Sequence, residues 1–122
     1  MAWTARSPSL VRCSFKLPLA YNDGQTVEEA RREELLDLVF VEFGGWTEEG
    51  VERGAYRQQG TGKKHVEYLM KIGVAVADAA AVDRLRDLVA RIGGELGQEC
   101  MYFEVSTGTS VELVPSAKKG GR

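Results

Sequence analysis

Residues 65–94, HVEYLMKIGVAVADAAAVDRLRDLVARIGG, decide the fold class. Strict alternation over 65–76 predicts a strand, and its core-facing set is predicted to be Val66, Tyr68, Met70, Ile72, Val74 and Val76. Asp78 then stands at a helix N-cap position, and apolar residues recur at helical spacing from Val82 to Ile92. The pair Gly93-Gly94 predicts the end of this helix.

The chain before this stretch predicts another strand and another helix. Alternation over 10–19 indicates a half-buried strand, and Tyr21-Asn22-Asp23-Gly24 is typical of a turn. Thr26 and Glu29 have the spacing of a capping box, and the following apolar pattern predicts a helix over 27–43 that ends at Gly44-Gly45.

The remaining segments complete a β-α-β-β-α-β order. We expect residues 46–64 to be irregular, with one short strand over 55–59, and the last strand to cover 99–105 before an edge strand over 111–114. This order predicts an α+β, ferredoxin-like sandwich, an antiparallel sheet with two helices on one face. The predicted core comprises Leu36, Phe40, Met70, Ile72, Leu85, Val89 and Phe103.

Length and composition bound the class of protein. A chain of 122 residues with 43% hydrophobic and 28% charged residues suits one domain, predicted at 10–114 between an N-terminal extension, 1–9, and a basic tail, 115–122. The net charge of -2 gives no field for nucleic acid or membrane. We expect a cytoplasmic protein, because no signal-peptide core or membrane span is present, with Cys13 and Cys100 as reduced thiols.

Familiar catalytic motifs are missing. Gly60-Thr61-Gly62-Lys63-Lys64 lacks the outer glycine and the Ser or Thr of a phosphate loop, and we expect a hairpin turn there. His65 and Glu67 share a strand face and are the candidate catalytic pair, with solvated strand-end residues as the alternative. Glu67, Glu99 and Glu104 could act as paired carboxylates, or could simply pair with cations across the sheet. The sequence predicts no metal site and no cofactor.

The most unusual local composition lies around the second strand. Trp46, Thr47, Tyr56 and Arg57 combine aromatic rings, a hydroxyl and a guanidinium with neighbouring glycines, which is typical of a ligand-contacting loop. They are the candidate ligand-binding residues. The alternative is a helix cap over which Trp46 folds onto the core.

Four short motifs, YNDG, FGGWT, GAYR and GQECMYFEV, occur in that order around the two helices. In this the chain resembles a group of short uncharacterised bacterial proteins with an FGG-aromatic-T element, a G-aromatic-basic step and a GQE-type final strand. The 50–54 stretch departs from that pattern by being short. The resemblance implies a ferredoxin-like fold and transfers no catalytic residue.

Two functions from different classes compete. The first is a non-enzymatic binding module, a homodimer through the open sheet face, with a small-molecule or protein ligand. That face is predicted to carry Leu69, Ala75, Cys100 and Tyr102 among Arg12, Ser14, Lys71 and Glu104. The alternative is a small dimeric enzyme with its site between the open face and the 46–57 loop. Binding of RNA on the sheet is disfavoured, because the central-strand aromatics are predicted to point inward.

Overall fold

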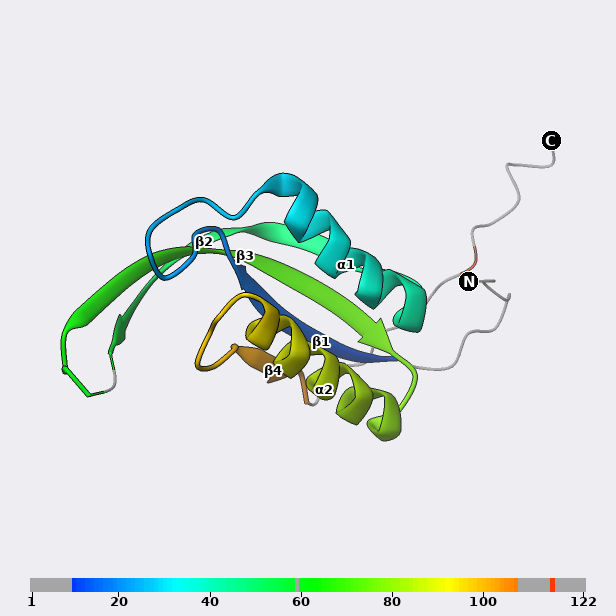
Figure 1. Cartoon of the computed structure of the whole chain (residues 1–122). Helices are drawn as coiled ribbons and strands as arrows, with labels where there is room; N and C mark the ends of the chain where they lie inside the picture. The colour runs from blue at the N-terminus through cyan, green and yellow to red at the C-terminus, as the bar shows by residue number, and fades with distance from the viewer. Residues whose placement is uncertain (1–9, 59, 108–114, 116–122) are drawn as a thin grey trace.

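Six elements follow one another in the order β-α-β-β-α-β (Figure 1). The structure is a computed structural model that describes residues 10–58, 60–107 and 115. The elements are β1 (Val11–Pro18), α1 (Glu29–Phe43), β2 (Thr47–Arg57), β3 (Lys64–Val76), α2 (Ala79–Glu95) and β4 (Phe103–Val105). The predicted ferredoxin-like α+β fold is confirmed.

The strands form one antiparallel sheet in the order β2-β3-β1-β4. The central pair aligns Val11 with Val76 and Pro18 with Leu69, and β4 pairs Cys13 with Val105. Directly paired residues share a face, so this register places Lys16 of β1 and Leu69 of β3 on the same side of the sheet.

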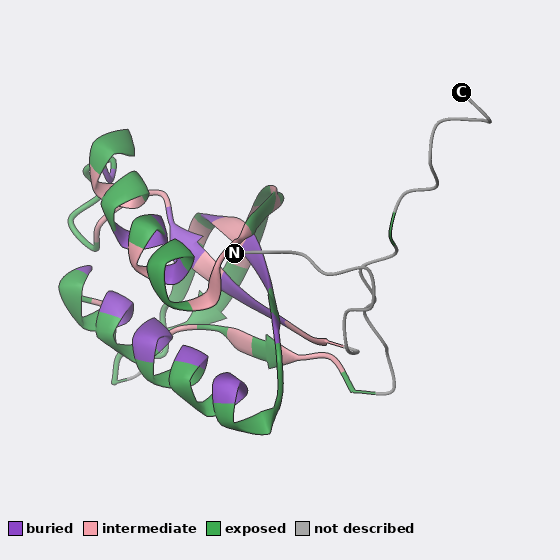
Figure 2. Ribbon diagram, turned by 90° about the vertical axis from the view of Figure 1, so that its right-hand side faces the viewer, coloured by how far each residue is buried: buried purple, intermediate pink, exposed green. Residues whose placement is uncertain are grey.

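Both helices cover the same side of the sheet, and the core lies between the two layers (Figure 2). Phe15 and Ile72 are fully buried from the sheet, and Leu35 and Leu85 meet them from the helices. Of the predicted core, Leu36, Ile72, Leu85 and Val89 are buried, whereas Met70 and Phe103 are only partly buried against it.

The outer halves of β2 and β3 extend beyond the helices as a two-stranded ribbon (Figure 1), which we call the arm: residues 51–57 and 64–70 with their connecting turn. Val66 and Tyr68 lie on the helix side of the sheet, as their phase predicts. They are nevertheless exposed, at 39% and 56%, because the helices do not reach over their part of the arm. The prediction that these two residues are buried is therefore wrong.

The predicted irregular segment 46–64, with a short strand over 55–59, is in fact mostly strand β2. Glycines suggested a break, but Gly50 sits at the register shift between Glu48 and Gly50 with a φ of 117°. A glycine there permits a bulge that side chains would strain. Continuous pairing with β3 then keeps the rest of the segment extended.

Helix α1 begins later than the sequence predicts, and its buried face is different. Thr26 pairs with Ala20 in an isolated bridge, so it is held extended; the N-cap is Glu28, without a side-chain cap. Leu35, Leu36 and Val39 form the buried stripe, and Phe40 turns outward at 54% exposure. The predicted burial of Phe40 is wrong. The end of the helix is as predicted, at Gly44 with a φ of 84°.

Helix α2 begins as predicted, because Asp78 Oδ1 accepts a hydrogen bond of 2.8 Å from the amide of Ala81. It does not end at Gly93-Gly94 but continues to Glu95, and Gly97 then adopts a φ of 67°. Strand β4 is shorter than predicted, because residues 99–102 run outside the sheet. The expected edge strand 111–114 lies outside the described residues, as do the predicted terminal segments apart from Pro115.

Helices α1 and α2 have 15 and 17 residues, and neither is long and apolar enough to cross a bilayer; this holds for the described part of the chain.

Candidate functional site

The open face of the sheet is spanned by two ion pairs that cross β3 from β1 to β2. Arg12 binds Glu49, and the Lys16 Nζ lies 3.0 Å from Glu52 Oε1. Gly73 makes the first crossing possible, because a Cβ there would stand 2.8 Å from a Glu49 oxygen. These pairs, not apolar side chains, occupy the middle of the face.

A groove of about 480 Å³ opens beside these pairs, where the arm leaves the body of the molecule. Its floor is the open face of β1 and β3, one wall is the end of β2, and the other wall is the segment between α2 and β4. The lining residues are Lys16, Pro18, Asn22, 56–58, His65, Glu67, Leu69 and 98–102. A volume of this size is typical of small-molecule sites.

The second wall is held in place by side-chain contacts. Asn22 Nδ2 donates to the Gly97 carbonyl at 2.8 Å, and Gln98 Nε2 donates to Asn22 Oδ1 at 3.2 Å. Met101 packs onto Gly93 of α2, where a Cβ would stand 2.5 Å from Met101 Cγ. The turn after β1 and the end of α2 therefore fix this wall together.

The groove carries both charges and two aromatic rings. Glu67 and Glu99 supply carboxylates, and His65 Nε2 lies 3.7 Å from Glu67 Oε2. Lys16 stands 4.0 Å from the centroid of the Tyr102 ring, which is a cation–π contact. The hydrogen bond with Glu52 raises the pKa of Lys16, so this cation is fixed in its charged form.

The structure brings some of the sequence-predicted site residues together and separates others. Tyr56, Arg57, His65 and Glu67 all line the groove. Thr47 lies at the other end of β2 from Tyr56, and the rise per residue of a strand puts the two roughly 30 Å apart. Trp46 packs against the core. The role of Tyr56 and Arg57 in binding stays a prediction, and Trp46 and Thr47 do not share their groove.

Sequence reasoning did not assign Lys16, Asn22 and Gln98 to a site. Lys16 reaches the groove only through the pairing of β1 with β3. The one available signal was the motifs YNDG and GQECMY, which contain Asn22 and Gln98 and lie far apart in the sequence.

The two cysteines differ sharply in environment, and both are free thiols. Cys13 is fully buried under the helices, and burial raises the pKa of its thiol. Cys100 is exposed in the groove wall. Across the described residues, no three His, Cys, Asp or Glu side chains are grouped so as to hold a metal ion.

No protein-family model matches the chain, and no curated protein matches it. Two solved structures do match its fold over nearly the whole length. A phage SAM lyase in complex with S-methyl-5'-thioadenosine is 13% identical, covers 94% of this chain and 96% of its own, and has a TM-score of 0.61. A phage SAM lyase in the apo state is 12% identical, covers 97% of this chain and 100% of its own, and has a TM-score of 0.65.

These matches contradict the first function predicted from sequence, the non-enzymatic module that dimerises through its open sheet face. Both full-length structural neighbours are lyases, and one holds a small molecule. The open face itself argues in the same direction, since ion pairs cross it and Leu69 is only 6% exposed. The alternative predicted from sequence, a small dimeric enzyme with its site between the open sheet face and the 46–57 loop, agrees better with these neighbours.

Proposed function

We propose that the protein is a small enzyme that binds S-adenosylmethionine in the open-face groove and cleaves it as a lyase. The observation that carries this proposal is the groove itself, which stands on a fold shared over 94% of the chain with a phage SAM lyase that holds S-methyl-5'-thioadenosine.

The chemistry of the groove suits this ligand. S-adenosylmethionine carries an adenine ring, a sulfonium cation, an ammonium and a carboxylate. Glu67 and Glu99 would favour the two cations, and Arg57 the carboxylate. Tyr56 and Tyr102 would offer ring faces to the adenine or to the sulfonium. A groove with both signs of charge fits a zwitterionic ligand better than a simple anion.

The reaction would break the bond between sulfur and the four-carbon amino acid chain. Both bonding electrons stay on sulfur, which becomes the neutral thioether of S-methyl-5'-thioadenosine. A lyase consumes no water, so the released chain must either lose a neighbouring proton or be attacked by its own carboxylate. The first route needs a base, and His65 beside Glu67 is the pair in the groove that could accept the proton. The second route needs only that the chain be held in a folded conformation.

Charge loss at sulfur also indicates how the site would act. The substrate is cationic at sulfur and the thioether product is neutral, so a carboxylate near sulfur stabilises the ground state more than the product. Catalysis therefore depends on positioning the chain, with Glu67 holding the ammonium, which stays charged through the reaction.

Binding tests the proposal directly. Isothermal titration should show S-adenosylmethionine binding more tightly than S-adenosylhomocysteine, which lacks the sulfonium charge. Glu67→Gln should weaken the binding of S-adenosylmethionine by about tenfold or more, the value of one lost charge-assisted contact. Asp87→Asn, on the exposed side of α2, is the matched control and should bind as the wild type does. Equal affinity of wild type and Glu67→Gln would contradict the assigned groove.

Three finer predictions from sequence stay proposals beside this one. The chain is proposed to belong with the bacterial FGG-aromatic-T proteins, to be cytoplasmic, and to form homo-oligomers. The first is supported by the motifs that contain Asn22 and Gln98, since these two residues hold the groove wall in place.

A further inference from the structure

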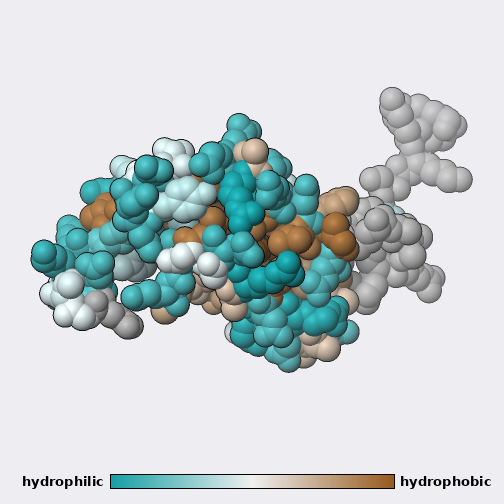
Figure 3. Space-filling model, in the orientation of Figure 1, coloured by the Kyte–Doolittle hydropathy of each residue, from teal (hydrophilic) through white to brown (hydrophobic). Residues whose placement is uncertain are grey.

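Large apolar side chains are exposed at seven described positions, and the groove accounts for only two of them. Tyr56 and Tyr102 line the groove. The other five gather in two places: Val51, Val66 and Tyr68 on the helix side of the arm, and Phe40 and Val41 on the outer face of α1. Figure 3 shows hydrophobic colour at both places, on the arm at the left and beside the end of α1 at the right.

The two apolar patches carry opposite charge. The arm patch consists of Val51, Val66 and Tyr68 with the cations Arg53 and Lys64, which share their face of the ribbon. Arg57 pairs with Lys64, so it stands at the edge of the same face, and it also lines the groove. The segment 53–66 has four Lys and Arg residues and no acidic residue. The helix patch consists of Phe40 and Val41 with Glu33 and Asp37, one to two turns before them on α1. Charge is therefore segregated on a molecule whose net charge is only -2.

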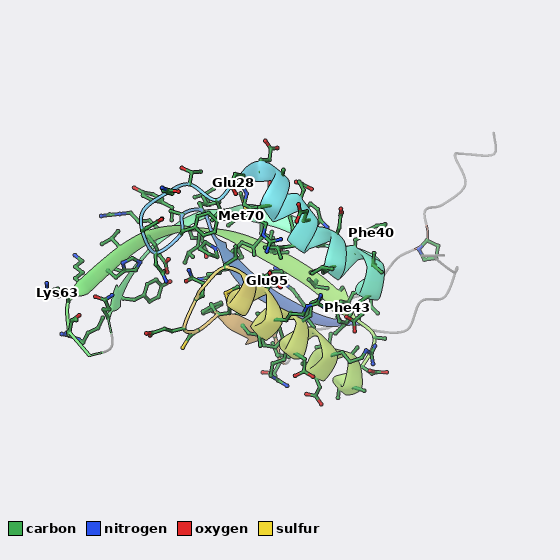
Figure 4. The ribbon with its side chains drawn as sticks, viewed as in Figure 1. Glu28, Phe40, Phe43, Lys63, Met70 and Glu95 are labelled. Carbon is green, nitrogen blue, oxygen red and sulfur yellow. The ribbon has the colours of Figure 1, made fainter. Side chains whose placement is uncertain are left out.

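Neither patch is neutralised within its own chain. Elsewhere on α1, Glu34 pairs with Arg31, and Glu42 with Arg84. Among the described residues, Glu33 and Asp37 form no ion pair, and neither do Arg53 and Lys64. Figure 4 shows why the two patches cannot meet: Lys63 marks the arm tip at one end of the molecule, and Phe40 points away from the sheet at the other.

We propose that the arm patch of one copy of this chain docks on the helix patch of the next copy. Apolar side chains would meet apolar side chains, and the arm cations would meet the helix carboxylates. Contact between two arm patches is disfavoured, because it would bring like charges together. The groove opens on the opposite face of the ribbon, so this contact leaves it accessible and does not depend on the proposed function.

The geometry of such a contact is head to tail. Each copy uses two different surfaces, so every docked arm leaves another arm free, and the assembly either closes into a ring or grows as an open filament, depending on the rotation between copies. A two-fold dimer, by contrast, would use one surface twice. Because exposed charges contribute to the contact, association should weaken as salt is raised from about 0.05 M to about 0.5 M.

Charge reversal on the full chain tests the proposal by sedimentation velocity. An arm variant, Arg53→Glu with Lys64→Glu, and a helix variant, Glu33→Lys with Asp37→Lys, should each sediment as monomers under conditions where the wild type is assembled. A chain that carries all four reversals should assemble again, since its patches are complementary once more. Arg91→Glu, on the exposed side of α2, is the control and should assemble as the wild type does.

Circular dichroism of each variant should match the wild type, because all four residues are exposed. A variant that fails to fold is replaced by its neutral counterpart, Arg53→Gln with Lys64→Gln or Glu33→Gln with Asp37→Asn. A wild type that remains monomeric would overturn the proposal. So would a helix variant that still assembles, or a four-fold variant that stays monomeric, since both outcomes would mean that the arm contacts another surface.

Discussion

Cys13 lies on β1 under the helices and Cys100 in the groove wall, and the two thiols should differ in reactivity. Cys100 is exposed beside the groove, whereas Cys13 is fully buried and burial raises its thiol pKa. Since the thiolate is the reactive form, we expect one fast equivalent of labelling at about pH 8 from Cys100. The second thiol should react only as the protein unfolds.

Cys100→Ser checks this assignment, because it should remove the fast phase and leave the slow one. The raised pKa of Cys13 also makes the stability of the protein depend on pH. The Cys13 thiol contributes fully to the free energy of unfolding below the ordinary thiol pKa, roughly 8.5. This contribution is lost as pH rises through the pKa of Cys13 in the folded state. Rapid labelling of Cys13 in the folded Cys100→Ser variant would contradict its burial.

Phe40 shows how far one turn along a helix changes the effect of a mutation. It is 54% exposed, whereas Leu36 on the buried stripe is 2% exposed. Phe40→Ala should lower the free energy of unfolding by less than about 1 kcal/mol, and Leu36→Ala by about 2–5 kcal/mol. Denaturant titration of both variants measures the difference. Equal losses would place Phe40 in a core contact that the structure does not have.

At the scale of elements, two adjacent glycines near the end of α2 have opposite roles. A Cβ at Gly93 would stand 2.5 Å from Met101 Cγ, whereas a Cβ at Gly94 would meet nothing within 4 Å. Gly94→Ala should therefore stabilise the protein by up to about 1 kcal/mol, the helix propensity difference. Gly93→Ala should not stabilise the protein in this way, because the new methyl group would force Met101, and the groove wall with it, to move.

A double-mutant cycle with Met101→Ala measures this coupling. In a chain that already carries Met101→Ala, adding Gly93→Ala should no longer lower the free energy of unfolding, since the clashing atoms are gone. Additive effects of the two mutations would mean that Met101 does not pack on α2.

The same elements show what the sequence could and could not predict. Alternation gave the phase of β3 correctly, but it carries no information on whether a helix lies above Val66 and Tyr68. Glycine is ambiguous in the same way. Gly44 ends α1, whereas Gly93 lies within α2, where a side chain would clash with Met101. Contacts between distant segments decide such cases, and local pattern does not contain them.

The candidate site follows the same rule. Tyr56, Arg57, His65 and Glu67 could be selected because they are unusual in type and near one another in sequence. Lys16 and Gln98 could not, because strand pairing and the wall contacts bring them to the groove. Trp46 also stands out in the sequence, but its role is structural, because it packs against the core.

For the whole molecule, the fold separates two surfaces with different chemistry. The open face holds a groove with both charges and exposed aromatic rings, while the helix side has a basic arm at one end and an acidic, apolar helix end at the other. Ligand binding and self-association are therefore proposed on opposite sides of one sheet, and apart from Arg57, which borders both surfaces, mutations on one side can be made without touching the other.

The most direct measurement follows S-adenosylmethionine by chromatography after it is mixed with the purified protein alone. We expect S-methyl-5'-thioadenosine to appear in proportion to protein and time, with no oxygen from labelled water at the carbon that left sulfur. The rate should fall at least about tenfold in Glu67→Gln and stay unchanged in Asp87→Asn. Binding of S-adenosylmethionine without any S-methyl-5'-thioadenosine, or solvent oxygen at that carbon, would contradict the assignment of this protein as a lyase.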